Sequence, residues 1–286
     1  MNATPVAAPR RQVTATIDGQ TVRVSEGATI LDACRSKGID TPTLCYLENL
    51  TPVNVCRVCV VEVEGSRTLV PACSRPLEAD MVVNTDTERV RHSRKLVFEL
   101  LGSSTDLSLV SEDTKAWMDT YGARPDRFGA TAEKVDEPFR QQDDLYVRDY
   151  DKCILCYRCV EACGTDAQNT FAIAVSGRGF EARISTEWDA VLPDSACVYC
   201  GNCVGVCPTG ALMFTSEYER REAGTWNPAE QTITETICSY CGVGCAVNLH
   251  VQEGEIVKVT SPLDNDITNG HLCVKGRFGW TFVHNK

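Results

Sequence analysis

Cysteine is the residue type whose number and spacing in this sequence point most directly to chemistry. The chain has 286 residues and 17 cysteines, and all of these except Cys34 fall into four groups of four. Each group contains a pair separated by two residues, a spacing that indicates metal binding outside disulfide-rich secreted proteins. The groups are Cys45, Cys56, Cys59 and Cys73; Cys153, Cys156, Cys159 and Cys163; Cys197, Cys200, Cys203 and Cys207; and Cys238, Cys241, Cys245 and Cys273.

The second and third groups both fit the run C-x2-C-x2-C-x3-C, which binds [4Fe–4S] clusters in bacterial ferredoxins. In two-cluster ferredoxins the last cysteine of each run ligates the other cluster. Pro208 follows the third group, as in that pattern, whereas Gly164 follows the second. Structural zinc is the alternative for C-x2-C pairs, but two consecutive runs with this period favour clusters. The predicted ligand sets are Cys153, Cys156, Cys159 and Cys207 for one cluster, and Cys197, Cys200, Cys203 and Cys163 for the other.

The first group lies among two predicted hairpins and a helix. In the segment VTATIDGQTVRV, apolar and polar residues alternate on both sides of a turn at Asp18-Gly19. The second hairpin, VCVVEVEGSRTLVPAC, turns at residues 64–66. Between them, Ser25 is the expected cap of a short helix that ends near Gly38. Hairpin, helix, ligand loop and returning strand predict a β-grasp fold around a [2Fe–2S] cluster. Cys34 lies on the apolar face of the helix and is interpreted as a core residue.

The spacing of the first group also separates it from plant-type ferredoxins, which have four residues between their first two ligands. Here ten residues lie between Cys45 and Cys56. That wider spacing resembles the β-grasp module of respiratory complex I and its relatives.

The fourth group has the pattern C-x2-C-x3-C-x27-C followed by Val274-Lys275-Gly276. AVNLHV and EIVKVTS are predicted strands joined at Glu253-Gly254. The segment resembles the N-terminal cluster domain of molybdenum or tungsten bis-pterin oxidoreductases. That resemblance implies that Cys238, Cys241, Cys245 and Cys273 hold a [4Fe–4S] cluster and that Lys275 lies between cluster and pterin. The alternative for Lys275 is an exposed lysine in a basic turn.

In order, the sequence predicts a modular α+β chain. Its parts are a flexible tail (1–12), a β-grasp [2Fe–2S] domain (13–85), a helical linker (86–148), a bacterial-type ferredoxin domain with two [4Fe–4S] clusters (149–222) and a small β-rich [4Fe–4S] domain of the molybdopterin oxidoreductase type (232–286). This series resembles the N-terminal third of the α subunit of cytoplasmic, NAD-dependent formate dehydrogenases. It also resembles the large iron–sulfur subunit of complex I.

One expected element is missing from the linker. Both families have a cluster site with one histidine and three cysteines after the β-grasp domain, in a pattern like H-x3-C-x2-C-x5-C. Ser103, Leu107 and Val110 stand at the first three of these positions, so we expect packing instead of a cluster. His92 has no nearby cysteines and is interpreted as structural or exposed. The acidic segment 122–152 is interpreted as a surface loop.

The resemblance implies an electron-relay role in an oxidoreductase. Its cofactors would be one [2Fe–2S] and three [4Fe–4S] clusters here, with a Mo- or W-bis-pterin guanine dinucleotide, FMN and NAD on associated domains or subunits. Its partners would be a flavin- and NAD-binding iron–sulfur subunit and a pterin-binding catalytic domain, on another polypeptide or on a longer form of this chain. The alternatives are an iron–sulfur subunit of complex I or of a hydrogenase diaphorase, and a free-standing electron carrier.

Charge and hydropathy restrict the remaining partners and the compartment. With 28 basic and 39 acidic side chains, the formal charge is −11, which argues against nucleic acid. No apolar run reaches the ~20 residues of a membrane span, and residues 1–13 have no signal-peptide core. We therefore expect a cytoplasmic protein with no membrane span.

Overall fold

The structure is a computed structural model that describes residues 11–284. The chain divides into one unit of residues 1–44, 54–100 and 113–125 and a second unit of residues 45–53, 101–112 and 126–286. Most of the predicted tail, residues 1–10, lies outside the described residues, and the first strand already begins at Gln12.

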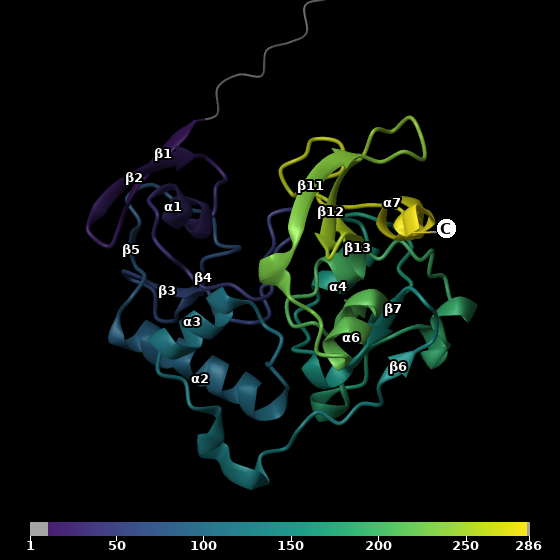
Figure 1. Ribbon diagram of the computed structural model, residues 1–286. Coiled ribbons are helices and arrows are strands. Elements are labelled where there is room, and N and C mark those ends of the chain that lie inside the picture. Colours follow the sequence, from purple (N-terminus) through teal and green to yellow (C-terminus); the bar gives the residue numbers. More distant parts are fainter. Residues whose placement is uncertain (1–10, 285–286) are drawn as a thin grey trace, which may run out of the picture. The chain divides into compact units, whose positions relative to one another are not determined.

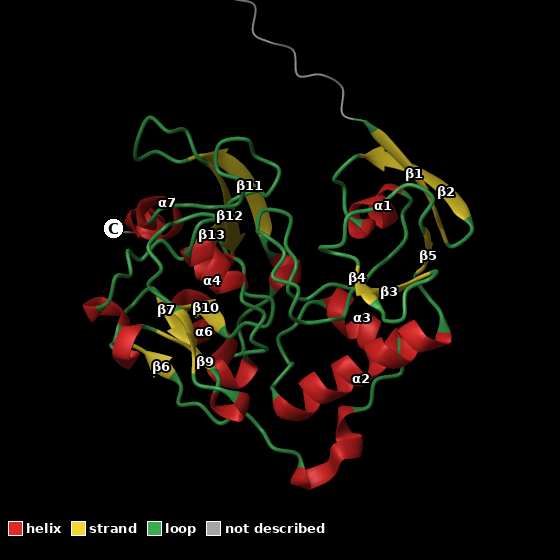
Figure 2. Ribbon diagram, turned by 180° about the vertical axis from the view of Figure 1, so that it is seen from behind, coloured by secondary structure: helices red, strands yellow, loops and turns green. Residues whose placement is uncertain are grey.

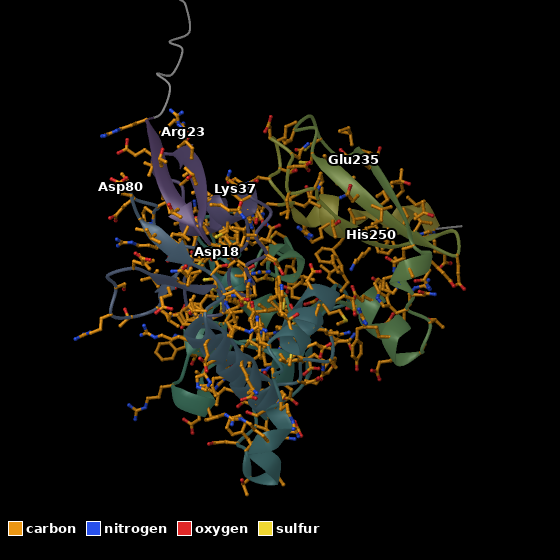
Figure 3. All side chains as sticks on the ribbon, turned by 90° about the vertical axis from the view of Figure 1, so that its left-hand side faces the viewer. Asp18, Arg23, Lys37, Asp80, Glu235 and His250 are labelled. Carbon is orange, nitrogen blue, oxygen red and sulfur yellow. The ribbon has the colours of Figure 1, made fainter. Side chains whose placement is uncertain are left out.

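A five-stranded sheet forms the framework of the first unit, in the order β2-β1-β5-β3-β4 (Figure 1). β1 and β5 are parallel, and the other neighbours are antiparallel. Asp18, in the turn after β1, accepts hydrogen bonds from the Thr85 amide and hydroxyl at 2.7 and 2.6 Å, which fixes the turn to the end of β5 (Figure 3). The strands are β1 (Gln12–Ile17), β2 (Gln20–Ser25), β3 (Val60–Val63), β4 (Val70–Pro71) and β5 (Val82–Asn84).

Helix α1 (Ile30–Ser36) contacts β2 (Figure 2). Its apolar side chains Ile30, Leu31, Ala33 and Cys34 are buried. Its cap is Thr29, whose Oγ1 accepts the Asp32 amide at 3.1 Å while the Asp32 carboxylate accepts the Thr29 amide at 2.8 Å. This reciprocal pair is a capping box. The prediction of Ser25 as the cap is wrong, because Ser25 still belongs to β2 and the chain turns through Gly27 before the helix begins.

Two helices follow the first sheet, α2 (Glu88–Ser104) and α3 (Glu112–Thr120). The buried Arg94 of α2 donates to Val60 O at 2.9 Å and to the Tyr121 hydroxyl at 2.5 Å, so it joins α2 to β3 and to the residues after α3. At two of the positions where a histidine-ligated cluster would need cysteines, Leu107 is half-buried and Val110 is buried. His92 is exposed.

The second unit contains three small sheets and several short helices. The sheets have the orders β10-β7-β6, β8-β9 and β11-β12-β13. The strands are β6 (Arg140–Gln141), β7 (Tyr146–Arg148), β8 (Ala174–Ser176), β9 (Arg183–Ser185), β10 (Leu212–Phe214), β11 (Thr232–Ile237), β12 (Ala246–Gln252) and β13 (Glu255–Thr260). The α-helices are α4 (Arg158–Cys163), α5 (Asn202–Gly205), α6 (Thr215–Glu222) and α7 (Val274–Phe278).

Short 3-10 helices occupy many of the connections. They are η1 (Pro125–Thr131), η2 (Tyr150–Lys152), η3 (Gly179–Glu181), η4 (Glu187–Asp189), η5 (Leu192–Asp194), η6 (Pro228–Glu230) and η7 (Gly279–His284). No helix within residues 11–284 combines the length and the apolar character needed to cross a bilayer.

The end of segment 122–152 is not a surface loop, which corrects the interpretation from sequence. All residues of β7 are buried, and β7 pairs antiparallel with β10. Tyr146 and Tyr150 pack into one core with Phe214 and Phe278, so this segment contributes to the interior of the second unit. The strand is short and lies among charged residues, which hid it in the sequence.

The C-terminal sheet contains the two strands predicted at Glu253-Gly254, β12 and β13, and an additional exposed edge strand, β11. His250 on β12 bonds to the Thr260 hydroxyl at 2.9 Å (Figure 3). Burial, followed by the Lys258 ammonium, lowers the pKa of His250 to about 4, and Glu217 opposes that shift.

The first prediction concerns the cap of α1. Thr29→Ala should destabilise the helix by about 1 kcal/mol, since it leaves the Asp32 amide without its acceptor. Amide hydrogen exchange of α1 should accelerate by about fivefold, because local opening governs exchange. The matched control is Ser25→Ala, which should change the exchange of α1 little. Equal acceleration in both variants would contradict the assignment of the cap.

The second prediction concerns acid stability. Because the folded pKa of His250 lies below that of a free imidazole, its contribution to stability is present above pH 6.5 and is lost as pH falls toward about 4. The melting temperature should therefore fall less over this interval in His250→Gln than in the wild-type chain. An NMR titration should place the His250 imidazole near pH 4, and a midpoint near 6.5 would refute the prediction.

Candidate metal centres

The two ferredoxin-type runs adopt the same local backbone. In the first run Leu155 and Tyr157 have left-handed φ values of 50° and 66°, and Tyr199 and Gly201 have values of 56° and 68° in the second. Each run then enters a short helix, α4 or α5. Because of this shared backbone conformation, the first sulfur of each run accepts a backbone amide at 3.4 Å. Leu155 N–H donates to Cys153 Sγ, and Tyr199 N–H donates to Cys197 Sγ.

The first three cysteines of the first run lie near Cys207, the last cysteine of the second. Burial raises the pKa of Cys153 to about 11 and the pKa of Cys156 to about 12, and the Cys207 thiol contributes to both increases. Burial also raises the pKa of Cys159 far above its usual range, with contributions from Cys156, Cys207 and Cys153. Cys207 thus raises the pKa of all three thiols of the first run, and their ligation of one cluster stays a prediction.

The second run has the reciprocal arrangement with Cys163. Burial raises the pKa of Cys200, and the Cys163 and Cys197 thiols add to the increase. The pKa of Cys203 is raised by burial and then by Cys200, Cys197 and Cys163. Cys163 Sγ also accepts the Ala172 amide at 3.2 Å and lies 3.4 Å from the Thr170 hydroxyl.

The fourth group lies around the ends of the C-terminal strands. Cys238 follows β11, Cys245 precedes β12, and Cys273 caps α7. The Cys238 amide donates to Cys245 O at 2.8 Å. Burial raises the pKa of Cys245, with contributions from Cys238, Cys241 and Cys273 in that order. Cys241 and Cys273 are exposed, and the ligation of one cluster by these four cysteines stays a prediction.

Lys275 is exposed, and its ammonium lies 5.9 Å from the centroid of the Tyr240 ring. Together with Cys238 and Trp280 it lines a cavity of about 210 Å³ beside the fourth group. The position is compatible with a ligand contact and also with the exposed lysine that the sequence left as an alternative.

The residues of the first group do not all belong to the same unit. Cys56, Cys59 and Cys73 belong to the first unit, and Cys45 begins segment 45–53 of the second. The Ala72 amide donates to Cys59 O at 3.1 Å, so the β3–β4 hairpin brings the chain segments at Cys59 and Cys73 together. Cys34 is fully buried within α1, and burial raises its pKa, which agrees with a core residue.

Two side chains beside the second ferredoxin-type run were not identified from the sequence. The Tyr146 hydroxyl lies 3.3 Å from Cys197 Sγ, and the buried Arg277 donates to Cys200 O at 3.0 Å. Arg277 stands in the segment VKGRFG beside Lys275, so no signal in the sequence separates it from a surface arginine. Among residues 11–284, no three histidine, cysteine or carboxylate side chains are close enough to share one metal ion.

Three protein families match successive parts of the chain. Residues 10–88 match the 2Fe-2S iron-sulfur cluster binding domain, residues 145–213 match the ferredoxin-like domain of NADH-quinone oxidoreductase subunit 3, and residues 231–285 match the molybdopterin oxidoreductase Fe4S4 domain. These matches support mixed α/β iron–sulfur domains of the three types.

Several whole proteins are similar to this chain. An NADH-quinone oxidoreductase subunit of Rhizobium meliloti is 33% identical over 95% of this chain and 31% of its own length. NADP-reducing hydrogenase subunit HndD of Solidesulfovibrio fructosivorans is 42% identical over 78% of this chain and 40% of its own length. A putative formate dehydrogenase of Staphylococcus haemolyticus is 27% identical over 94% of this chain and 31% of its own length.

The chain thus spans about a third of the length of the first of these relatives. Among solved structures, an NAD+-reducing [NiFe]-hydrogenase in the H2-reduced state has a TM-score of 0.61 at 25% identity, over 71% of this chain and 87% of the other. Three successive segments of the chain therefore match iron–sulfur domain families, and the whole proteins similar to the chain include an NADH-quinone oxidoreductase subunit and a putative formate dehydrogenase.

Proposed function

We propose that the chain is the electron-transfer iron–sulfur region of a molybdenum- or tungsten-dependent formate dehydrogenase that reduces NAD. The observation that carries this proposal is the fourth cysteine group with Lys275, within residues that match the molybdopterin oxidoreductase Fe4S4 domain. A cluster domain of this type has its clearest use beside a pterin. The formate dehydrogenase relatives, which align over 94% of the chain, support the same assignment.

The four cysteine groups are the proposed ligands of one [2Fe–2S] and three [4Fe–4S] clusters, with the crossed assignment of Cys163 and Cys207. Thiolates are the ligands that such clusters require. Burial raises the pKa of thiols such as Cys153, so they are protonated in the metal-free chain at neutral pH, and binding must release protons. When bound, the clusters supply one-electron transfer.

The chain's own residues hold and shield these sites. Amides of Leu155 and Tyr199 point at ligand sulfurs, where hydrogen bonds influence reduction potential. The core around Tyr150 and Phe278 limits the access of water to the ferredoxin-type sites. Lys275 is the proposed contact to the pterin, through the cavity that it lines.

This function implies two partners and a compartment. A flavin- and NAD-binding iron–sulfur subunit would accept electrons, and a pterin-binding domain or subunit would oxidise formate. We propose a cytoplasmic complex, in line with the NAD-dependent members that the sequence resembles.

A second candidate has specific support. The hydrogenase subunit HndD is more similar in sequence, at 42% identity, than the formate dehydrogenase at 27%. An iron–sulfur subunit of a hydrogenase or of complex I therefore competes directly with the first proposal. A free-standing electron carrier is the third candidate.

Elemental analysis of the complex purified from its native source separates these candidates. The first proposal predicts about one Mo or W atom per copy of this chain in the complex, and about 14 iron atoms in this region when it is iron-loaded on its own. Formate would be the first substrate to assay. Iron without Mo or W would refute the formate dehydrogenase and favour the second or third candidate.

Paired cysteine substitutions test the crossed ligand sets in the iron-loaded chain. Cys163→Ser with Cys197→Ser should remove about four iron atoms, because both residues serve one cluster. Cys163→Ser with Cys153→Ser should remove about eight, because they serve two.

The reverse result would assign each run its own fourth cysteine. Cys34→Ala is the matched control and should leave the iron content unchanged. Loss of iron in that variant would make Cys34 a ligand instead of a core residue.

A further inference from the structure

Arg277 enters the ferredoxin-type domain from helix α7 of the C-terminal domain. Its side chain is 1% exposed. Nε donates to Cys200 O at 3.0 Å, and a terminal nitrogen donates to Asn202 Oδ1 at 3.0 Å. The same Asn202 oxygen accepts the Leu272 amide at 3.0 Å, so one amide side chain fixes both the guanidinium and the segment that leads to α7.

Two glycines of the second run form the space for this side chain. A Cβ atom at Gly201 would lie 2.4 Å from Arg277 Cδ and 2.7 Å from a ring carbon of Phe278. A Cβ atom at Gly205 would lie 3.0 Å from a terminal nitrogen of Arg277. We call the space beside Gly201 and Gly205 the glycine socket. Its wall is the backbone of the cysteine run itself, and the guanidinium lies directly against that backbone.

The charge of Arg277 is buried, and its hydrogen-bond partners are neutral oxygens. A buried charge is costly unless an opposite charge compensates it. The bond from Nε to Cys200 O holds the guanidinium against the run that carries the sulfurs of Cys197, Cys200 and Cys203. Negative charge on these sulfurs, as in a thiolate-ligated cluster, would provide the compensation.

Tyr146 supplies an independent contact to the same group of cysteines. Its hydroxyl lies 3.3 Å from Cys197 Sγ, and the residue is 2% exposed. A thiolate ligand has no proton to donate, so in the loaded site the hydroxyl must be the donor. The equivalent sulfur of the first run, Cys153 Sγ, accepts the Leu155 amide, and no side chain described in residues 11–284 bonds to it.

The first run also has a cationic side chain nearby, Arg158, but its electrostatic effect on the site is weaker than that of Arg277. Arg158 lies in the first run, two residues after Cys156. Arg158 is half-buried and bonds to Tyr46 O. Water screens a partly exposed charge much more than a buried one, so Arg158 does not match Arg277.

We propose that Arg277 and Tyr146 make the site of Cys163, Cys197, Cys200 and Cys203 the higher-potential member of the ferredoxin-type pair, with Arg277 as its buried counter-charge. One-electron reduction adds negative charge to a cluster. A nearby cation and an O–H donor to sulfur therefore stabilise the reduced form more than the oxidised form. The inference rests on the ligand sets proposed above. Arg277 is a positioning residue that acts through the site.

The test is an EPR-monitored redox titration of the iron-loaded full chain. Tyr146→Phe should shift one [4Fe–4S] wave to a more negative potential, and this shift identifies the Cys197 site. Arg277→Gln should shift the same wave in the same direction, whereas Arg277→Lys, which retains the charge, should largely restore it. Cys153→Ser identifies the wave of the other site, which should titrate at a more negative potential than the Cys197 wave in the wild-type chain.

A buried tyrosine of the other run provides the matched control. The Tyr150 hydroxyl lies 3.4 Å from an Arg148 nitrogen instead of a sulfur, so Tyr150→Phe should leave both waves in place. The inference is overturned if the wave sensitive to Tyr146→Phe is the more negative one, if neither wave moves, or if Arg277→Gln leaves that wave unchanged.

The iron content separates this failure from failure of the ligand sets. If the wild-type chain binds all its clusters and the variants titrate at the same potentials as the wild type, only the inference is contradicted. A chain in which the paired cysteine substitutions give the uncrossed pattern contradicts the ligand sets first. If Arg277→Gln does not fold, Tyr146→Phe and Cys153→Ser still decide the order of potentials.

Discussion

The left-handed backbone of the two cysteine runs is the constraint on which the second unit depends. Three closely spaced cysteines can surround a cluster only if the backbone between them changes from right-handed to left-handed conformation. Both runs achieve this with left-handed residues at equivalent positions, including Tyr157 in one and Gly201 in the other. A left-handed conformation is sterically unfavourable for tyrosine, which has a Cβ atom. Glycine adopts it without this steric cost and leaves space beside the backbone.

The glycine at this position in the second run gives the two runs different surroundings, although their backbones are alike. The space at Gly201 is filled by Arg277 and Phe278, and Phe278 continues into the core that contains Tyr146 and Phe214. The same core receives β7, which pairs with β10 and carries Tyr146 toward Cys197. Packing around the second run therefore links a strand that precedes both ferredoxin-type runs with a helix that follows Cys273.

The sequence was most informative where spacing alone limits geometry. The two C-x2-C-x2-C-x3-C runs predict crossed ligand sets, and in the structure Cys207 raises the pKa of thiols in the first run and Cys163 raises that of thiols in the second. The hairpin at Glu253-Gly254 was predicted correctly from alternation and a turn. Cluster type and ligation stay predictions, since the grouping of thiols does not itself measure iron.

The sequence was least informative where a few residues change environment through distant contacts. β7 is too short, among charged neighbours, for alternation to identify it. β11 is exposed throughout and is held by pairing with β12, so burial leaves no pattern in its sequence. Arg277 reads like any surface arginine, because its burial depends on glycines about seventy residues earlier. The cap of α1 was misplaced since Ser25 and Thr29 offer similar chemistry.

The glycine socket also bears on how such modular chains are assembled over evolutionary time. A ferredoxin module transferred without its C-terminal neighbour would expose a groove shaped for a guanidinium and an aromatic ring. A neighbour transferred alone would carry a charged side chain and Phe278 with nowhere to bury them. The two modules are therefore expected to be inherited and exchanged as a pair, with the recombination point outside residues 146–278.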